Sequence, residues 1–220
     1  MTMVVKESKV SPIMRLQFDF HGLYAITDST LMPSAHLTDA VAQAIAGGAK
    51  VIQYRDKSHD TARRRHEAAQ LRECCARHDV CFIVNDDVEL ARQTGADGVH
   101  IGADDSRIAA ARALLGEQAV IGVSCYNRLA NAEQAVAEGA DYVAFGRFFP
   151  SRTKPDAVTA TPELLTRAGG LSCPVVAIGG ITPDNGRALV AAGATMLAVV
   201  DGVFGQADIK AAAQRYTELF

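Results

Sequence analysis

The sequence predicts an α/β protein built as a single (β/α)8 barrel, or TIM barrel, with a short N-terminal extension. A motif in which a predicted helix ends in Gly-Ala and an apolar run follows occurs four times along the chain. Further apolar runs lie between these copies, and helical patterns connect them. Alternating strand–helix units, eight in number, are typical of a barrel that closes on itself.

The repeated motif combines a helix terminator with a buried strand. Glycine just past a helix supplies the left-handed C-terminal cap, and a run of β-branched or aromatic residues fits a strand buried on both faces. The four copies begin at Gly47, Gly95, Gly139 and Gly193. The apolar runs between them predict four more strands, at 23–26, 81–84, 119–123 and 174–178.

The segments between the strands show helical spacing and chemically explicit helix starts. Leu37, Val41 and Ala44 share one helical face. Thr-Pro-acid sequences at 161–163 and 182–184 each place an N-cap threonine before a proline at the first helical position. The acid that follows suits the positive end of the helix dipole.

An open, doubly wound sheet also alternates strands and helices. Such a sheet normally has five or six strands and often carries a GxGxxG sequence after the first strand. No such sequence follows 23–26 here, so the barrel is favoured. We assign residues 1–20 to the extension and 21–220 to one barrel domain. The length of this domain lies at the lower end of the range for such barrels, roughly 200 to over 400 residues.

The composition is that of an ordinary globular protein, with 49% hydrophobic and 21% charged residues and a net charge of −3. We expect no nucleic-acid partner and no membrane partner, because the net charge is slightly negative and there is no apolar run of about 20 residues. The five cysteines contain no CxxC pair, and the first twenty residues contain no signal-peptide core. These features predict reduced thiols and a cytoplasmic location, and they leave open whether the chain forms a homo-oligomer.

Polar residues gather just after the predicted strands. In this fold the C-terminal ends of the strands form the active-site mouth. The polar residues at the strand ends are Gln53, Tyr54, Arg55, Asp56, Lys57, Asn85, Asp86, Asp87, His100, Asp104, Asp105, Ser124, Ser151, Arg152, Thr153, Lys154 and Asp201, and the site candidates Gly179, Gly180 and Val200 lie beside them.

Two anion sites are predicted among them. Gly179-Gly180 allows close backbone approach to a phosphate beside the helix that starts at Thr182, although such a pair can also simply close a tight loop. Arg55, Lys57 and Lys154 suit an oxyanion-dense ligand such as a diphosphate. A single basic residue is more often a solvated surface cation. Three of them at strand ends, together with the hydroxyls of Ser151 and Thr153, favour a binding site.

Asp86 and Asp105 follow neighbouring strands and lie near the basic cluster. Magnesium prefers one or two carboxylates together with phosphate oxygens and water, so we expect these two acids to hold it. The alternative role is helix N-capping, and for Asp87 and Asp104 we prefer capping or exposure to solvent. We expect His100 to be a packed or hydrogen-bonded strand-end residue, because no second histidine lies at ligand spacing.

Taken together, seven motifs in this order resemble the thiamine-phosphate synthase family, from about Gly22 to the C-terminus. The motifs are the run 53–57, Asn85-Asp86, the stretch from Gly98 to Asp105, 122–124, 149–154, 177–181 and 198–200. The resemblance implies a transferase that condenses 4-amino-2-methyl-5-hydroxymethylpyrimidine diphosphate with a thiazole phosphate to give thiamine phosphate and pyrophosphate.

The resemblance also implies residue roles. Asp86 and Asp105 would hold magnesium, and the catalytic set would be Arg55, Lys57, Lys154 and Ser124. The pyrimidine diphosphate would contact Gln53, Arg55, Lys57, Asn85, Ser124 and Lys154, with Tyr54 and Asp56 in the same run. The thiazole phosphate would lie among Ser151, Arg152, Thr153, Gly179, Gly180, Val200 and Asp201.

Two positions depart from the family pattern. Asp201 stands where serine is usual, and Ala103 stands where glutamine is usual. A carboxylate beside the expected phosphate would oppose it unless it points away or caps the following turn. Two alternatives therefore stay in view, a thiazole tautomerase-like relative on the same barrel and a non-catalytic phosphate-binding barrel.

Overall fold

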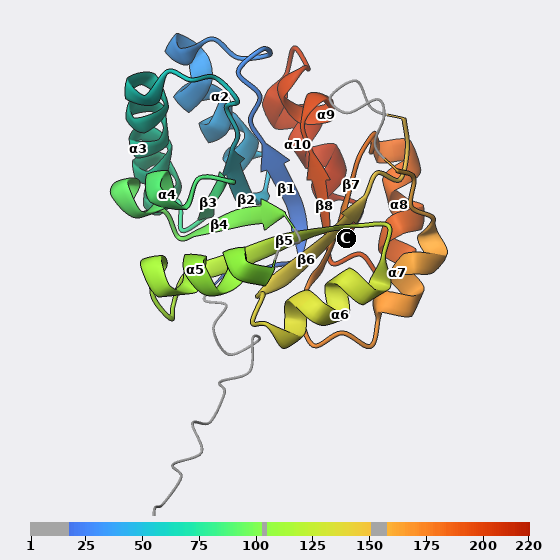
Figure 1. Ribbon diagram of the computed structural model, residues 1–220. Helices are drawn as coiled ribbons and strands as arrows, with labels where there is room; N and C mark the ends of the chain where they lie inside the picture. Colours follow the sequence, from blue (N-terminus) through green and yellow to red (C-terminus); the bar gives the residue numbers. More distant parts are fainter. Residues whose placement is uncertain (1–17, 103–104, 151–157) are drawn as a thin grey trace, which may run out of the picture.

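The computed structural model describes residues 18–102, 105–150 and 158–220, and in them eight parallel strands form a closed barrel (Figure 1). Each strand pairs with the next, and β8 pairs with β1, which confirms the predicted fold. The strands are β1 Gly22–Ile26, β2 Ala49–Tyr54, β3 Cys81–Asn85, β4 Gly98–Gly102, β5 Val120–Tyr126, β6 Tyr142–Gly146, β7 Val175–Ile178 and β8 Met196–Val199.

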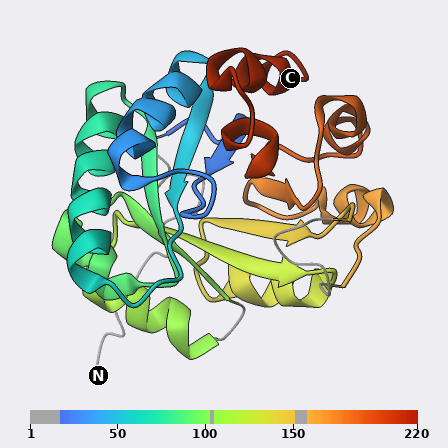
Figure 2. The ribbon, with the colours of Figure 1, turned by 90° about the horizontal axis from the view of Figure 1, so that it is seen from above.

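Helices surround the barrel, as the view from above shows (Figure 2). Both Thr-Pro helix starts are confirmed, and Thr182 forms a reciprocal capping box with Asn185. Within the described ranges, no helix combines the length and apolar character needed to cross a bilayer. The helices are α2 Ser34–Ala46, α3 Thr61–Arg77, α4 Val88–Thr94, α5 Asp105–Leu115, α6 Leu129–Ala137, α7 Pro162–Ala168, α8 Pro183–Ala191, α9 Asp201–Phe204 and α10 Ile209–Thr217.

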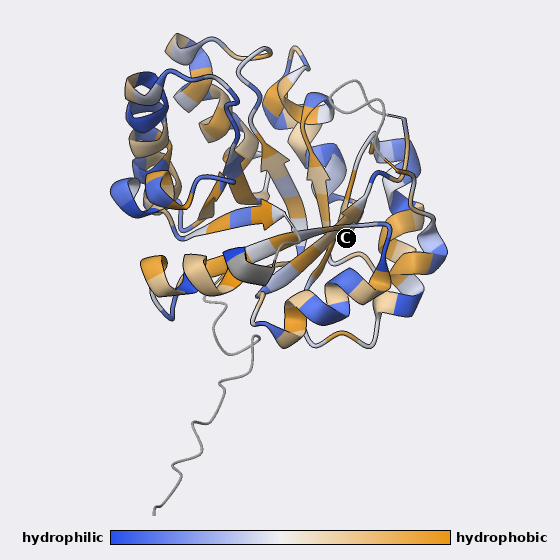
Figure 3. Ribbon diagram, viewed as in Figure 1, coloured by the Kyte–Doolittle hydropathy of each residue, from blue (hydrophilic) through white to orange (hydrophobic). Residues whose placement is uncertain are grey.

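The alternation of side chains along each strand creates two cores. One lies between the barrel and the helices, which carry both hydrophilic and hydrophobic residues, while the strands are mostly hydrophobic (Figure 3). The other fills the barrel and includes Tyr24, Tyr142 and Met196. Phe20, which the sequence assigned to the extension, packs into this inner core with its ring 5.2 Å from that of Tyr142.

Three copies of the repeat lock neighbouring strands together through the residue that follows Gly-Ala. In the 95–97 and 139–141 copies, a carboxylate accepts a backbone N–H from the start of the preceding strand, at 2.8 Å for Asp97 with Phe82 and for Asp141 with Ile121. The hydroxyl of Thr195 accepts the Val175 N–H at 3.0 Å in the last copy. The same three residues donate their own N–H to the carbonyl of that partner, so each copy makes a two-bond clamp.

Candidate active site

A cluster of charged and amide groups lies where β2 and β3 end. The Nζ of Lys57 is 3.3 Å from Oδ2 of Asp86, and the same oxygen accepts a hydrogen bond from Nδ2 of Asn85 at 2.8 Å. Arg107 donates to the backbone carbonyl of Asp86 at 3.2 Å, and its guanidinium is 3.9 Å from Oδ1. Sequence reasoning missed Arg107, because it lies inside α5 and not at a strand end.

The backbone holds Asp86 in a conformation that few residue types accept. Its φ is 61°, in the left-handed region that aspartate tolerates better than most residues. Its N–H donates to the carbonyl of His100 at 2.8 Å, which ties the end of β3 to β4. The side chain keeps 45% of its surface exposed, so the carboxylate remains accessible to a ligand.

Arg55 lies at the same end of the barrel, but it already has an anionic partner. Its guanidinium is 3.4 Å from Oδ2 of Asp28, and both side chains are mostly buried. Its backbone N–H donates to the hydroxyl of Thr27, which is itself buried. Asp28 and Thr27 therefore position Arg55, and the sequence patterns did not indicate them.

Tyr54 and Asp56, which the sequence grouped with the substrate contacts, bind neighbouring protein groups. Tyr54 lies in the outer core and donates its hydroxyl to Glu67 at 2.6 Å. Asp56 accepts the Ser58 N–H at 2.8 Å and pairs with Arg63 at 2.6 Å. Burial raises the pKa of Asp56, but these hydrogen bonds and the arginine offset the effect, so that the pKa falls below its ordinary value. Both side chains thus hold the N-terminal half of α3, Asp56 through Arg63 and Tyr54 through Glu67.

Gln53 and Ser124 are joined by hydrogen bonds through the barrel interior. Nε2 of Gln53 donates to the hydroxyl of Tyr24 at 2.7 Å, and that hydroxyl is 2.8 Å from the hydroxyl of Tyr142. His100 completes the path, with Nδ1 3.0 Å from Tyr142 and Nε2 2.8 Å from Ser124. The expectation that His100 is a hydrogen-bonded strand-end residue is confirmed. The two tyrosines were missed, although a buried tyrosine hydroxyl normally needs a partner.

The Gly179-Gly180 turn is explained in part by packing. Gly180 has a φ of +63°, and a β-carbon there would come within 2.3 Å of the Pro150 carbonyl oxygen. The loop after β6 therefore passes too close for any other residue. At the capping box that follows, the Thr182 N–H donates to the Asn185 side chain, so that amide already has a partner.

At the end of β8, Val200 forms the N-cap of α9 and Asp201 is its first helical residue. The Oδ1 of Asp201 lies alongside Gly205, where a β-carbon would be only 2.6 Å away. The carboxylate thus packs along α9. The backbone carbonyl of Asp201 accepts hydrogen bonds from the Gly205 N–H and the Gln206 side chain.

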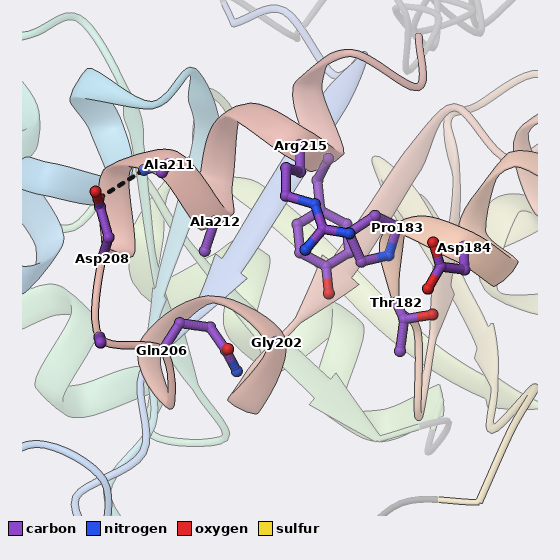
Figure 4. A pocket seen from close by; sticks show the side chains of 11 residues that line it. Thr182, Pro183, Asp184, Gly202, Gln206, Asp208, Ala211, Ala212 and Arg215 are labelled. Atoms are coloured by element: carbon purple, nitrogen blue, oxygen red, sulfur yellow. Dashed lines mark hydrogen bonds between the residues drawn. The ribbon is translucent and has the colours of Figure 1, made fainter.

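A pocket of about 510 Å³ lies between the starts of α8 and α9 and the face of α10 (Figure 4). Thr182, Asp184, Gly202 and Arg215 are among its lining residues. None of the site residues proposed from the sequence is among those that line it in the described part of the chain. The pocket therefore lies beside the expected phosphate end and does not coincide with the Lys57–Asp86 cluster.

Several predicted site residues lie outside the described residues. Among the side chains at 18–102, 107–150 and 158–220, no group of three or more histidine, cysteine, aspartate or glutamate residues could hold a metal ion. The predicted site residues outside the described ones are Asp104, Ser151, Arg152, Thr153, Lys154 and the side chain of Asp105.

Asp87 lies within the described residues. Its side chain accepts the Leu90 N–H at 2.9 Å and pairs with Arg64, which confirms its capping role.

The chain is similar to several known proteins. A family model described as thiamine monophosphate synthase matches residues 23–203. A thiamine-phosphate synthase from Nitrosococcus oceani is 52% identical over 200 residues, which is 90% of this chain and 92% of that protein. One from Chromobacterium violaceum is 53% identical over 193 residues, with 88% and 93% covered.

Solved structures extend the comparison. A thiamine phosphate pyrophosphorylase from Pyrococcus furiosus superimposes with a TM-score of 0.82 at 33% identity, covering 94% of this chain and 96% of that one. A 3-hexulose-6-phosphate synthase superimposes at 0.67 with 19% identity over 90% of this chain and 99% of that one, a likeness that concerns the fold alone. Since the family match and the high identities span most of its length, the chain belongs to the thiamine-phosphate synthase family, transferases of thiamine biosynthesis.

Proposed function

We propose that this chain condenses the hydroxymethylpyrimidine diphosphate with the thiazole phosphate by a dissociative substitution assisted by magnesium. The bond between the pyrimidine methylene carbon and the diphosphate oxygen breaks first, and its electron pair leaves with the pyrophosphate. The aminopyrimidine ring stabilises the resulting cation. The thiazole nitrogen then donates its lone pair to the methylene carbon, which gives thiamine phosphate.

The protein contributes charge and position to this reaction, and a covalent nucleophile is not required. Lys57 and Arg55 face the departing diphosphate from the end of β2, and we assign Lys154 to the same task from its sequence position. Ser124, Gln53 and Asn85 hold the pyrimidine, and Gly180 lies next to the thiazole phosphate. The observation that carries the proposal is the Lys57–Asp86–Asn85 cluster at two neighbouring strand ends.

The residues present fit a magnesium ion. Asp86 offers an exposed carboxylate next to the cations expected to bind diphosphate, and we assign Asp105 as the second carboxylate. This donor set matches the preference of magnesium for one or two carboxylates supplemented by substrate phosphates and water. When bound, the ion would neutralise the charge that develops on the leaving diphosphate.

The purified protein, given both substrates and magnesium, is expected to release one pyrophosphate for each thiamine phosphate formed. Chelation of magnesium is expected to slow this release by roughly 100-fold, because a metal supplies several kcal/mol of charge stabilisation. A coupled pyrophosphate assay measures both rates. Folded protein that releases no pyrophosphate would refute the proposal, and isomerisation of the thiazole phosphate alone would favour the tautomerase alternative.

Asp201→Ser is expected to lower KM for the thiazole phosphate by roughly fivefold, since a nearby carboxylate opposes the phosphate by about 1 kcal/mol near a solvated surface. Asp208→Ser is the matched control. It also removes one negative charge, but serine keeps the N-cap that Asp208 provides to α10. Equal changes of KM in the two variants would show that only net charge matters, and the phosphate would then lie elsewhere.

We also place this enzyme in the cytoplasm, with small molecules as its substrates. All five cysteines are free and buried. Burial raises the pKa of Cys125 and of Cys173 to about 12, so their thiols stay protonated and unreactive. A chain with five structural thiols suits a reducing compartment.

A further inference from the structure

The five side chains that connect Gln53 to Ser124 cross the inside of the barrel, and we call them the relay. They come from five strands, in the order Gln53, Tyr24, Tyr142, His100 and Ser124. Tyr24 and Tyr142 are almost completely buried, and Gln53 keeps only 3% of its surface exposed. Gly122 makes room for the relay, because a β-carbon there would lie 1.9 Å from the Tyr142 ring.

The direction of the hydrogen bonds in the relay follows from counting protons. Each tyrosine hydroxyl has one proton, and a buried proton needs an acceptor. Because Gln53 donates to Tyr24, the proton of Tyr24 goes to Tyr142, its other hydrogen-bonding partner among the described residues. The proton of Tyr142 then goes to Nδ1 of His100.

The far end of the relay is fixed by the same count. With Nδ1 accepting, the ring proton of His100 lies on Nε2 and is donated to the Ser124 hydroxyl oxygen. The proton of Ser124 is then available to a ligand at the mouth. Burial raises the pKa of both tyrosines, so their hydroxyls stay protonated and the order is kept.

We propose that the relay is a positioning device that holds His100 as its Nε2–H tautomer and makes Ser124 a hydrogen-bond donor to an acceptor nitrogen of the aminopyrimidine. Tyr24, Tyr142 and His100 are then positioning residues, since they act through Gln53 and Ser124. The substrate assignment rests on the proposed function, whereas the proton order rests only on the geometry of the barrel interior.

The proton order is tested without any substrate. Protein labelled with 15N-histidine is examined by long-range 1H–15N correlation, and the His100 signal is assigned with His100→Gln. The expected result is the Nε2–H pattern in the wild type and its loss or change in Tyr142→Phe. An Nδ1–H pattern in the wild type would overturn the proposal, because the chain of bonds would then run from Ser124 to Gln53.

The effect on catalysis is tested with Tyr142→Phe, His100→Ala and His100→Gln. Loss of a relay hydrogen bond should lower kcat/KM for the pyrimidine diphosphate roughly tenfold, with KM for the thiazole phosphate within about twofold. His100→Gln, which can still place an N–H near Ser124, should recover part of the loss seen in His100→Ala.

Thr195→Val is the matched control, because it removes hydrogen bonds to Val175 at the opposite end of the barrel. It should lower the melting temperature without changing either kinetic constant. Kinetics of Tyr142→Phe that match those of Thr195→Val would overturn the positioning role. Wild-type protein that shows the Nε2–H pattern but releases no pyrophosphate would instead count against the proposed function.

Discussion

Asp86→Asn is expected to lower kcat roughly 100-fold while leaving the melting temperature within about 1 °C. The substitution keeps the shape of the side chain but removes the negative charge that we assign to magnesium, and several kcal/mol of charge stabilisation would be lost. Folding should tolerate the change, because the carboxylate is 45% exposed and its partner Lys57 is 60% exposed. Exposed ion pairs of this kind add little to stability.

The adjacent carboxylate provides a control with the opposite outcome. Asp87 caps α4 and pairs with Arg64, whose side chain is only 17% exposed. Asp87→Ala is therefore expected to cost about 1 kcal/mol of stability, with kcat unchanged. Steady-state kinetics and thermal melting on both variants separate the two roles. A kcat for Asp86→Asn near that of the wild type would exclude Asp86 as a metal ligand in turnover.

The barrel could be predicted from the sequence because its repeat encodes a physical unit. Each copy joins a helix end to a strand buried on both faces, which indicates a parallel sheet covered by helices. The number of strands and the missing GxGxxG sequence then favour the closed barrel over an open sheet. The same repeat also contained the inter-strand clamps, but these were not visible in the pattern. A carboxylate such as Asp141 looks like a loop residue until the neighbouring strand that it contacts is known.

The sequence predicted which residues lie at the strand ends, but it predicted less accurately the direction in which their side chains point. Lys57, Asp86 and Asn85 come together as expected, since adjacent parallel strands end at one edge. Tyr54 belongs to the same run but follows Gln53 by one residue, so its side chain points to the opposite face of the sheet. Tyr24, in the middle of β1, and Tyr142, at the start of β6, were overlooked for another reason, because within an apolar run they resemble ordinary core residues.

Asp141→Ala is expected to cause the largest loss of stability, about 3–5 kcal/mol, which for a chain of this size lowers the melting temperature by about 10 °C. Asp141 is completely buried, pairs with Arg112 at 2.6 Å and accepts the Ile121 N–H. Alanine would leave the mostly buried guanidinium without its carboxylate and the amide without an acceptor. Urea denaturation followed by circular dichroism measures the change in the free energy of unfolding.

Two further variants make this prediction decisive. Asp141→Asn retains an acceptor for the Ile121 N–H and should lose less stability than Asp141→Ala. It therefore provides a folded variant of intermediate stability. Glu89→Ala removes an equally short ion pair, 2.6 Å from Arg92, but both partners are about half exposed and solvated. Glu89→Ala should have the same melting temperature as the wild type, since water and salt screen such pairs. If Asp141→Ala also melted with the wild type, the clamp would not stabilise the barrel, and the repeated Gly-Ala-Asp sequence would be a turn motif only.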